Sequence, residues 1–142
     1  MSNTQFAFLN KTAVPDRTQL QAAIDALGFD LQLDPAFTPF ADRGFSPCVL
    51  RGQAGAGFEI FYDPSNAVVE EDEEDFWEII GTNDYCLSFV WHSSEADAAC
   101  VMIVCAALAQ AFGAVVSFEG DEPDSADTLL AAAKKMLAAL PQ

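Results

Sequence analysis

The chain has 142 residues, of which 51% are hydrophobic and 20% are charged, and its 22 acids against 6 bases give a formal net charge of −16. This length predicts one domain whose core needs neither metal nor disulfide support, and the apolar content excludes disorder over most of the chain. The acidity argues against nucleic-acid and anionic-membrane partners, because both require clustered Lys and Arg.

The first 33 residues predict a strand, a helix and a second strand. Residues 6–9 are apolar and are expected to form a short strand at the edge of a sheet. From Pro15 onward, apolar residues recur at positions 20, 23, 24 and 27, the spacing of one helix face, and Gly28 ends the predicted helix. Residues 29–33 alternate apolar and polar side chains, which is typical of a half-buried strand.

A loop and a hairpin are predicted next. Residues 34–47 contain three prolines and three phenylalanines, so we expect a loop anchored by the side chains of Phe37, Phe40 and Phe45. The apolar residues 46–51 and 57–62 predict two strands, and the glycine-rich residues between them predict that they form a hairpin, with residues 52–57 as its connection.

Two helices flank the best strand of the chain. An acidic run leads into a short predicted helix over residues 73–80, and residues 85–91 are apolar and aromatic, as a central strand requires. A longer helix is expected over residues 95–112, with Ser94 and Asp97 forming a capping box. Its middle is apolar on every face and must be covered on every face, so one hypothesis is a homodimer in which a second subunit covers it.

The uncharged residues 98–116 have the length of a membrane span. Gln110, Gly113 and the high alanine content favour instead a helix, a stop and a strand over residues 114–118, and no membrane partner is expected. A last amphipathic helix is predicted over residues 125–140. This order of elements predicts an α/β or α+β two-layer sandwich, with about five strands and three to four helices, in a single domain over residues 1–142.

The negative charge is concentrated in the second part of the chain. Residues 1–58 contain five acids and four bases, whereas residues 59–142 contain 17 acids and two bases. The densest run occupies residues 70–75, and a looser run occupies residues 119–127. A solvated loop and helix N-terminus is the simpler interpretation of such a run.

A functional interpretation comes from the neighbours of the dense run. Phe76 and Trp77 place apolar side chains inside a negative field, a combination suited to fast and tight recognition of a basic protein surface. An alternative role for Trp77 is to hold its helix on the core. The resulting hypothesis is a non-enzymatic binding protein with a basic protein partner. The predicted partner-binding residues are Glu70, Glu71, Asp72, Glu73, Glu74, Asp75, Phe76, Trp77, Glu78, Asp121, Glu122 and Asp124.

No motif for catalysis or for cofactor binding stands out. His92 is the only histidine, and the four cysteines lack the spacing of zinc ligands. Residues 121–127 do not match a calcium-binding loop, so no metal or cofactor is expected. The alternative to a binding protein is a small enzyme or ligand-binding domain with its site near the strand–helix junction at His92, a place where many α/β proteins hold ligands.

The cysteines also bear on location. Cys48, Cys86, Cys100 and Cys105 lie in apolar runs, as reduced buried thiols do. The first residues lack the basic segment of a secretory signal. Both features predict a cytoplasmic protein.

The core patterning resembles that of a known group of proteins. Residues 44–50, 57–60 and 84–91, together with the apolar helix that leads into residues 112–116, are similar to a family of small, largely uncharacterised bacterial proteins whose members are expected to be immunity proteins against secreted antibacterial toxins. The similarity spans roughly residues 29–140 and rests on core patterning rather than on a catalytic motif. It implies a cytoplasmic inhibitor whose acidic face blocks the basic, substrate-binding face of a toxin such as a nuclease.

Overall fold

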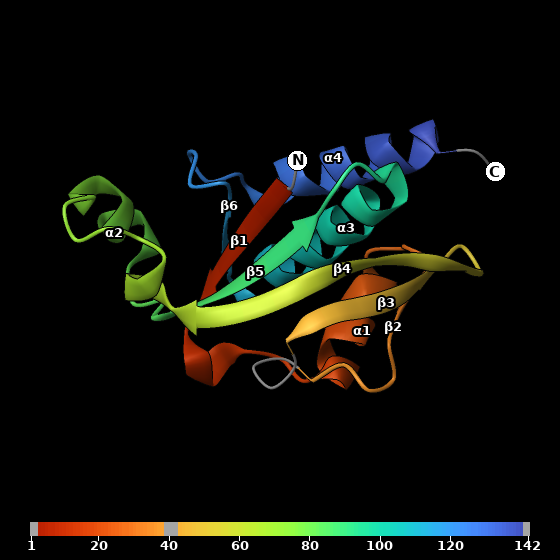
Figure 1. The fold of residues 1–142 in the computed structure, drawn as a ribbon, viewed down its shortest axis with the longest axis horizontal. Coiled ribbons are helices and arrows are strands. Elements are labelled where there is room, and N and C mark those ends of the chain that lie inside the picture. Colours follow the sequence, from red (N-terminus) through yellow and green to blue (C-terminus); the bar gives the residue numbers. More distant parts are fainter. Residues whose placement is uncertain (1–2, 39–42, 141–142) are drawn as a thin grey trace.

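The computed structural model describes residues 3–38 and 43–140, in which three helices cover one face of a six-stranded antiparallel sheet (Figure 1). This confirms the predicted two-layer α+β sandwich, with one strand more than the five expected. The strand order in the sheet is β2-β3-β4-β5-β1-β6. The strands are β1 (Asn3–Leu9), β2 (Leu31–Leu33), β3 (Gly44–Leu50), β4 (Gln53–Pro64), β5 (Tyr85–Trp91) and β6 (Val115–Phe118). The helices are α1 (Arg17–Ala26), α2 (Glu74–Ile80), α3 (Glu95–Phe112) and α4 (Ala126–Ala139), and two short 3-10 turns are η1 (Lys11–Ala13) and η2 (Ser65–Ala67).

Strand β1 lies inside the sheet, between β5 and β6, so the prediction of an edge strand was wrong. It pairs antiparallel with β5 along its whole length and with β6 over residues 5–8. The error has a physical reason, because both partners lie far along the chain and no local pattern links them to β1. Alternation along β1 directs Ala7 and Leu9 toward the helices and Phe6 and Phe8 toward the opposite face.

The predicted hairpin forms between β3 and β4, but its turn has only two residues. Arg51 and Gly52 both have positive φ, at 51° and 77°. This is the type I′ geometry, whose twist matches that of the flanking strands. The expected connection over residues 52–57 was wrong because β4 already begins at Gln53, and Gly55, at φ 107°, forms a bulge within the strand.

The loop before β3 is shorter than predicted. Strand β3 begins at Gly44, so Pro47 lies in a strand and not in the loop. Of the three expected aromatic anchors, Phe37 is buried, Phe45 is 62% exposed, and Phe40 lies outside the described residues. Phe45 is not an anchor because strand alternation turns its side chain toward the face without a helical layer.

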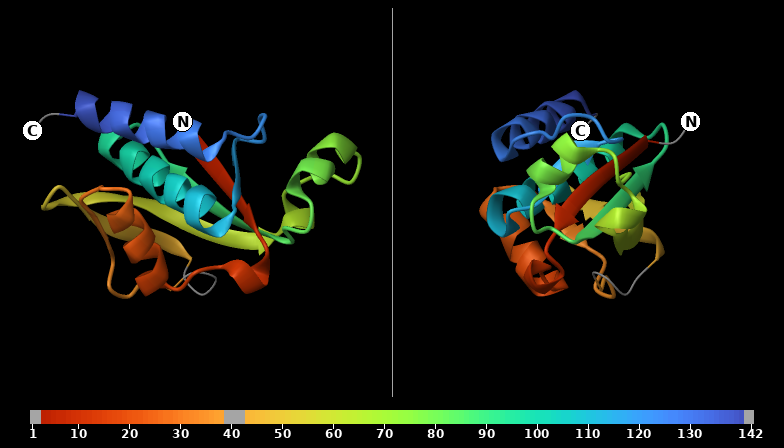
Figure 2. Two further views of the ribbon diagram at one scale, coloured as in Figure 1. Left: turned by 180° about the vertical axis from the view of Figure 1, so that it is seen from behind. Right: turned by 90° about the vertical axis from the view of Figure 1, so that its left-hand side faces the viewer.

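Helix α3 runs through the middle of the helical layer, over the sheet and flanked by α1 and α4 (Figure 2). Residues 99–108 are all buried, and elements of this same chain cover them. By length and hydropathy alone, α3 is the one helix in the described part of the chain that could cross a membrane. A second subunit is not needed to cover α3. The homodimer stays a prediction, but the need to cover this helix no longer supports it.

Only half of the predicted capping box forms at the start of α3. The Ser94 hydroxyl accepts a hydrogen bond from the backbone N–H of Asp97 at 3.3 Å. The Asp97 carboxylate accepts one from the backbone N–H of Gly57 in β4, at 3.0 Å, instead of returning to Ser94. The prediction failed because β4 extends past the end of its pairing with β5, and its Gly57 N–H becomes a donor for Asp97. This contact joins distant parts of the chain, so the local sequence does not reveal it.

Among the described residues, α2 is the helix that covers the face of the sheet opposite α1, α3 and α4, and it does so at one end. There Phe8 and Cys86 form a second buried cluster with Val69 and with Ile80 of α2. The Phe76 ring of α2 meets the Phe8 ring edge-on, with centroids 5.6 Å apart and planes at 72°. Figure 1 shows α2 projecting at one end of the molecule, and these side-chain contacts attach it to the sheet.

Candidate functional site

The dense acidic run forms the turn before α2 and the first turn of that helix. Residues 70–75 are all exposed. A carboxylate oxygen of Glu73 accepts a hydrogen bond from the backbone N–H of Glu70 at 3.0 Å. The indole N–H of Trp77 donates to the Glu70 carbonyl at 2.9 Å. These two bonds close the acidic turn onto the helix, so the carboxylates are presented on a defined scaffold.

Phe76 and Trp77 are half-buried and hold α2 in place. Phe76 packs on Phe8, and Trp77 joins the same cluster while its indole fixes the acidic turn. The exposed apolar side chain of this helix is Ile79, at 51%. Sequence reasoning missed it, although a signal was present: Phe76 and Ile80 are four residues apart and share the inward side of the helix, which turns Ile79 outward.

The two acidic runs meet in one cleft. Its volume is about 540 Å³, and it lies between α2 and the connection from β6 to α4. The connection contributes Glu122, which the sequence analysis predicted, and Pro123, which it did not. The residues lining the cleft are Asp72, Glu73, Glu74, Asp75, Phe76, Ile79, Glu122 and Pro123.

The remaining predicted residues do not line this cleft. Glu70 and Glu71 line a second cleft of about 590 Å³, and Asp72 lines both clefts. Trp77 serves the packing of α2, and Glu78 is exposed on the same helix. Neither Asp121 nor Asp124 lines the acidic cleft.

Backbone hydrogen bonds hold the second acidic run against β6. The Asp121 carbonyl accepts from the Ser117 hydroxyl at 2.6 Å, and the Asp124 N–H donates to the Val116 carbonyl at 3.0 Å. Glu119 adopts a positive φ of 53° at the start of this bend. Asp121 and Asp124 therefore shape the connection that brings Glu122 to the cleft.

Among the residues that the structure describes, no basic side chain forms an ion pair with the carboxylates of the acidic cleft. Within residues 3–38 and 43–140, the one ion pair closer than 4 Å joins His92 and Glu59, far from α2 in the sequence. Two of the six bases form hydrogen bonds elsewhere: Arg17 donates to the carbonyls of Leu33 and Asp34, and Arg43 donates to the Tyr62 carbonyl. The cleft therefore presents its carboxylates to solvent with no Lys or Arg of the described residues within 4 Å.

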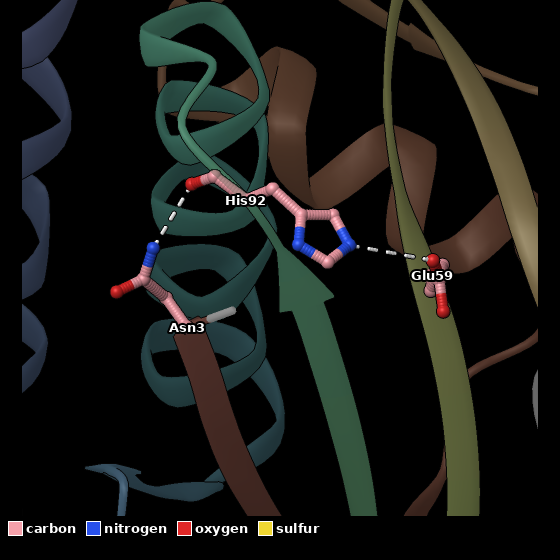
Figure 3. Close-up of polar contacts among 3 residues, drawn as sticks. All are labelled: Asn3, Glu59 and His92. Atoms are coloured by element: carbon pink, nitrogen blue, oxygen red, sulfur yellow. Dashed lines mark hydrogen bonds and ion pairs between the residues drawn. The ribbon is translucent and has the colours of Figure 1, made fainter. Parts of the chain in front are cut away.

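His92, the centre of the alternative hypothesis, is largely solvent-exposed. Its side chain is 65% exposed, with Nε2 3.8 Å from a carboxylate oxygen of Glu59 on β4 (Figure 3). Its carbonyl accepts a hydrogen bond from the Asn3 side chain at 2.9 Å, which ties it to β1. Such exposure provides none of the water exclusion that general acid–base sites use, so this geometry adds nothing in favour of the alternative.

The four cysteines are free and buried. Burial raises the pKa of Cys86 from 9.0 to about 12, and the hydrogen bond between Cys86 and Ser88 partly offsets this rise. The contact with Cys100 and burial both raise the pKa of Cys48 far above its usual value, and burial does the same for Cys105. These shifts oppose the thiolate form that a nucleophile or metal ligand requires, and no cluster able to hold a metal ion is found among the described residues.

The acidic cleft is therefore the best candidate for a functional site. The two acidic runs line it, Ile79 is exposed in it, and the hydrogen bond from Trp77 to Glu70 fixes the acidic turn. Comparisons of the chain with protein-family models, with curated proteins and with solved structures found no match, so the site is interpreted from its own residues.

Proposed function

We propose that this chain is a non-enzymatic binding protein whose acidic cleft takes a basic surface of a protein partner. The observation that carries the proposal is the meeting of the two acidic runs in one cleft. Five carboxylates surround it, with Ile79 exposed at its wall. A negative rim around an apolar contact suits a partner surface rich in Lys and Arg.

The electrostatics support rapid recognition. Because no Lys or Arg of the described residues lies within 4 Å of these carboxylates, their field reaches into solvent over about 8–10 Å at physiological salt. A field of this kind raises association rates with cations and weakens steeply as salt is added. The partner is therefore expected to be captured mainly through its association rate.

A toxin-immunity protein fits this chemistry. The resemblance in core patterning points to that class, and a nuclease toxin carries a basic face on which its nucleic-acid substrate binds. An acidic inhibitor that covers such a face excludes the substrate by charge as well as by shape. In this proposal the protein acts in the cytoplasm as the inhibitor of a cognate basic toxin.

Binding kinetics to the product of the adjacent gene test the proposal. The cleft variant combines Asp72→Asn, Glu73→Gln, Glu74→Gln and Asp75→Asn, all of which line the cleft; these changes keep hydrogen-bond acceptors but remove four charges. We expect its association rate at about 0.05 M salt to fall at least tenfold and its salt dependence to flatten.

A matched control removes the same number of charges elsewhere. It combines Asp25→Asn, Asp30→Asn, Glu95→Gln and Asp127→Asn, all exposed positions outside the cleft. This control is expected to retain most of the association rate, because local charge steers more strongly than net charge. Equal losses in the two variants, or an unchanged rate in the cleft variant, would contradict the acidic-cleft mechanism.

A further inference from the structure

The sheet has a second exposed surface that the acidic cleft does not include. We call it the open face: the side of β3, β4 and β5 that strand alternation turns away from α1, α3 and α4. In Figure 1 the helices lie behind the sheet and the open face points toward the viewer. Antiparallel sheets with one solvated face usually carry polar side chains there.

Strand β3 departs from that rule. Its outward side chains are Phe45, Pro47 and Val49, none of them polar, while its inward side chains Cys48 and Leu50 are buried. Phe45 and Val49 are 62% and 38% exposed. Two further apolar side chains on this face are half-buried: Val90 of β5, which Glu59 separates from Phe45 in the register, and Phe61, two residues along β4 from Glu59.

The backbone holds Phe45 in place. Its partner across the hairpin is Glu59, and its ring reaches over the next outward position of β4, Gly57, where an added Cβ would lie 2.7 Å from the Phe45 ring and 2.5 Å from the Ser46 carbonyl. The ring therefore lies across the glycine and keeps its other side in solvent. A side chain ordered before binding loses little entropy on contact, which is the property of an interface anchor.

The charged side chains that the strands place on the open face are carboxylates, and His92 lies 3.8 Å from one of them, Glu59. Glu59 and Asp63 project from β4 beside the apolar side chains, and none of the six strands contains Lys or Arg. The acidic helix α2 stands at one end of this face, on Phe8 and Cys86. A second copy of the chain, with its net charge of −16, would bring like charges together, whereas a basic partner would neutralise them.

The edges of the sheet are poor sites for an added strand. Edge strand β2 has three residues, and edge strand β6 has four and is bridged by Asp124. Docking onto the face is therefore favoured over strand addition. A sheet buries an apolar face against helices or a second sheet, and a single partner helix supplies such a layer without strand pairing.

We propose that the open face is the apolar half of the partner-binding surface and takes a basic amphipathic helix of the partner. The inference rests on the proposed function, because it is the same cationic partner that meets the acidic cleft. Apolar residues at helical spacing cover Phe45 and Val49, and Lys or Arg at the helix flanks face Glu59 and Asp63.

Three synthetic peptides of about 18 residues test this inference by fluorescence anisotropy at about 0.1 M salt. One carries Leu on one helix face and Lys on the other, the second has the same composition in scrambled order, and the third is oligolysine with the same number of lysines. We expect the amphipathic peptide to bind at least tenfold more tightly than the scrambled one, and the double variant Phe45→Thr, Val49→Thr to abolish that preference. The control Val14→Thr, outside the sheet, should preserve it.

The outcomes separate this inference from the proposed function. If all three peptides bind equally and the cleft variant weakens them together, the open-face inference is wrong and the proposed function stands. If no peptide binds, both fail. Val49→Thr alone provides a milder variant in case the double variant unfolds early. Sedimentation that reveals a dimer dependent on Phe45 would replace the basic helix with a second copy and overturn the inference.

Discussion

The Asp97 carboxylate accepts the backbone N–H of Gly57 at 3.0 Å, and this bond ties the first turn of α3 to β4 beyond the end of β5. Gly57 is buried, so its N–H would have no alternative partner in solvent if the carboxylate were lost. The bond therefore links the projecting β3–β4 hairpin, which carries Phe45 and Val49, to the helical layer.

Replacing Asp97 should weaken this link. We expect Asp97→Ala to lower the free energy of unfolding by about 2 kcal/mol, because it leaves a buried donor unpaired and removes a charged acceptor. Asp97→Asn keeps a carbonyl acceptor and should cost about half as much. Urea unfolding measures both, and equal losses in the two variants would mean that the negative charge, not the hydrogen bond, is what matters.

Gln5 is the opposite case, because replacing this buried side chain should increase the stability of the protein. Its amide is 0% exposed, and neither its oxygen nor its nitrogen has a hydrogen-bond partner among the described residues. We expect Gln5→Met, similar in shape but apolar, to raise the free energy of unfolding by about 1 kcal/mol. Gln5→Glu should destabilise strongly, since it buries a charge. A destabilised Gln5→Met variant would reveal that the amide is hydrogen-bonded after all.

The hairpin turn carries removable backbone strain. Arg51 has a φ of 51°, a left-handed conformation that costs an ordinary residue about 1 kcal/mol and that Asn tolerates better. We expect Arg51→Asn, which creates the preferred Asn-Gly pair of a type I′ turn, to raise stability by about 0.5–1 kcal/mol. Arg51→Ala removes the same side chain without relieving the strain and is the control. The thermal unfolding midpoint compares them, and identical midpoints would exclude the strain explanation.

The buried thiols should react only when the protein opens. With a pKa of about 12, Cys86 is ionised to about one part in ten thousand at pH 8, so a disulfide reagent should label the native protein at its unfolding rate. The raised folded pKa also predicts a pH effect: the contribution of Cys86 to stability is complete below pH 9 and is lost as pH rises from about 9 to about 12. Rapid labelling of Cys86 at pH 8 without unfolding would contradict the burial.

Local patterns predicted most of the elements. The segments expected over residues 15–27, 85–91, 95–112 and 125–140 occur within two residues of their predicted ends, because helix periodicity, caps and apolar runs are local signals. What failed was non-local. The position of β1, the partner of Asp97 and the outward side of Phe45 all depend on which strands meet, and no pattern within one segment encodes that.

The same division holds for the candidate site. The distribution of acidic residues located the two acidic runs, and the neighbouring Phe76 and Trp77 indicated that the first run belongs to a binding surface. That Glu122 faces Asp72 to Asp75 across a cleft depends on β6 lying beside β1 and on α2 packing on Phe8. Those contacts join segments from three parts of the chain, so the sequence predicted the charge but not the cleft.

The interior position of β1 has a consequence for synthesis. Leu9 pairs with Tyr85, and Phe8 pairs with Val115, so β1 has no strand to join until most of the chain has been translated. At typical elongation rates this wait is on the order of ten seconds, during which the apolar residues of β1 remain available to chaperones or to other nascent chains. The sheet is therefore completed late in synthesis, and the first strand to be translated is among the last to pair.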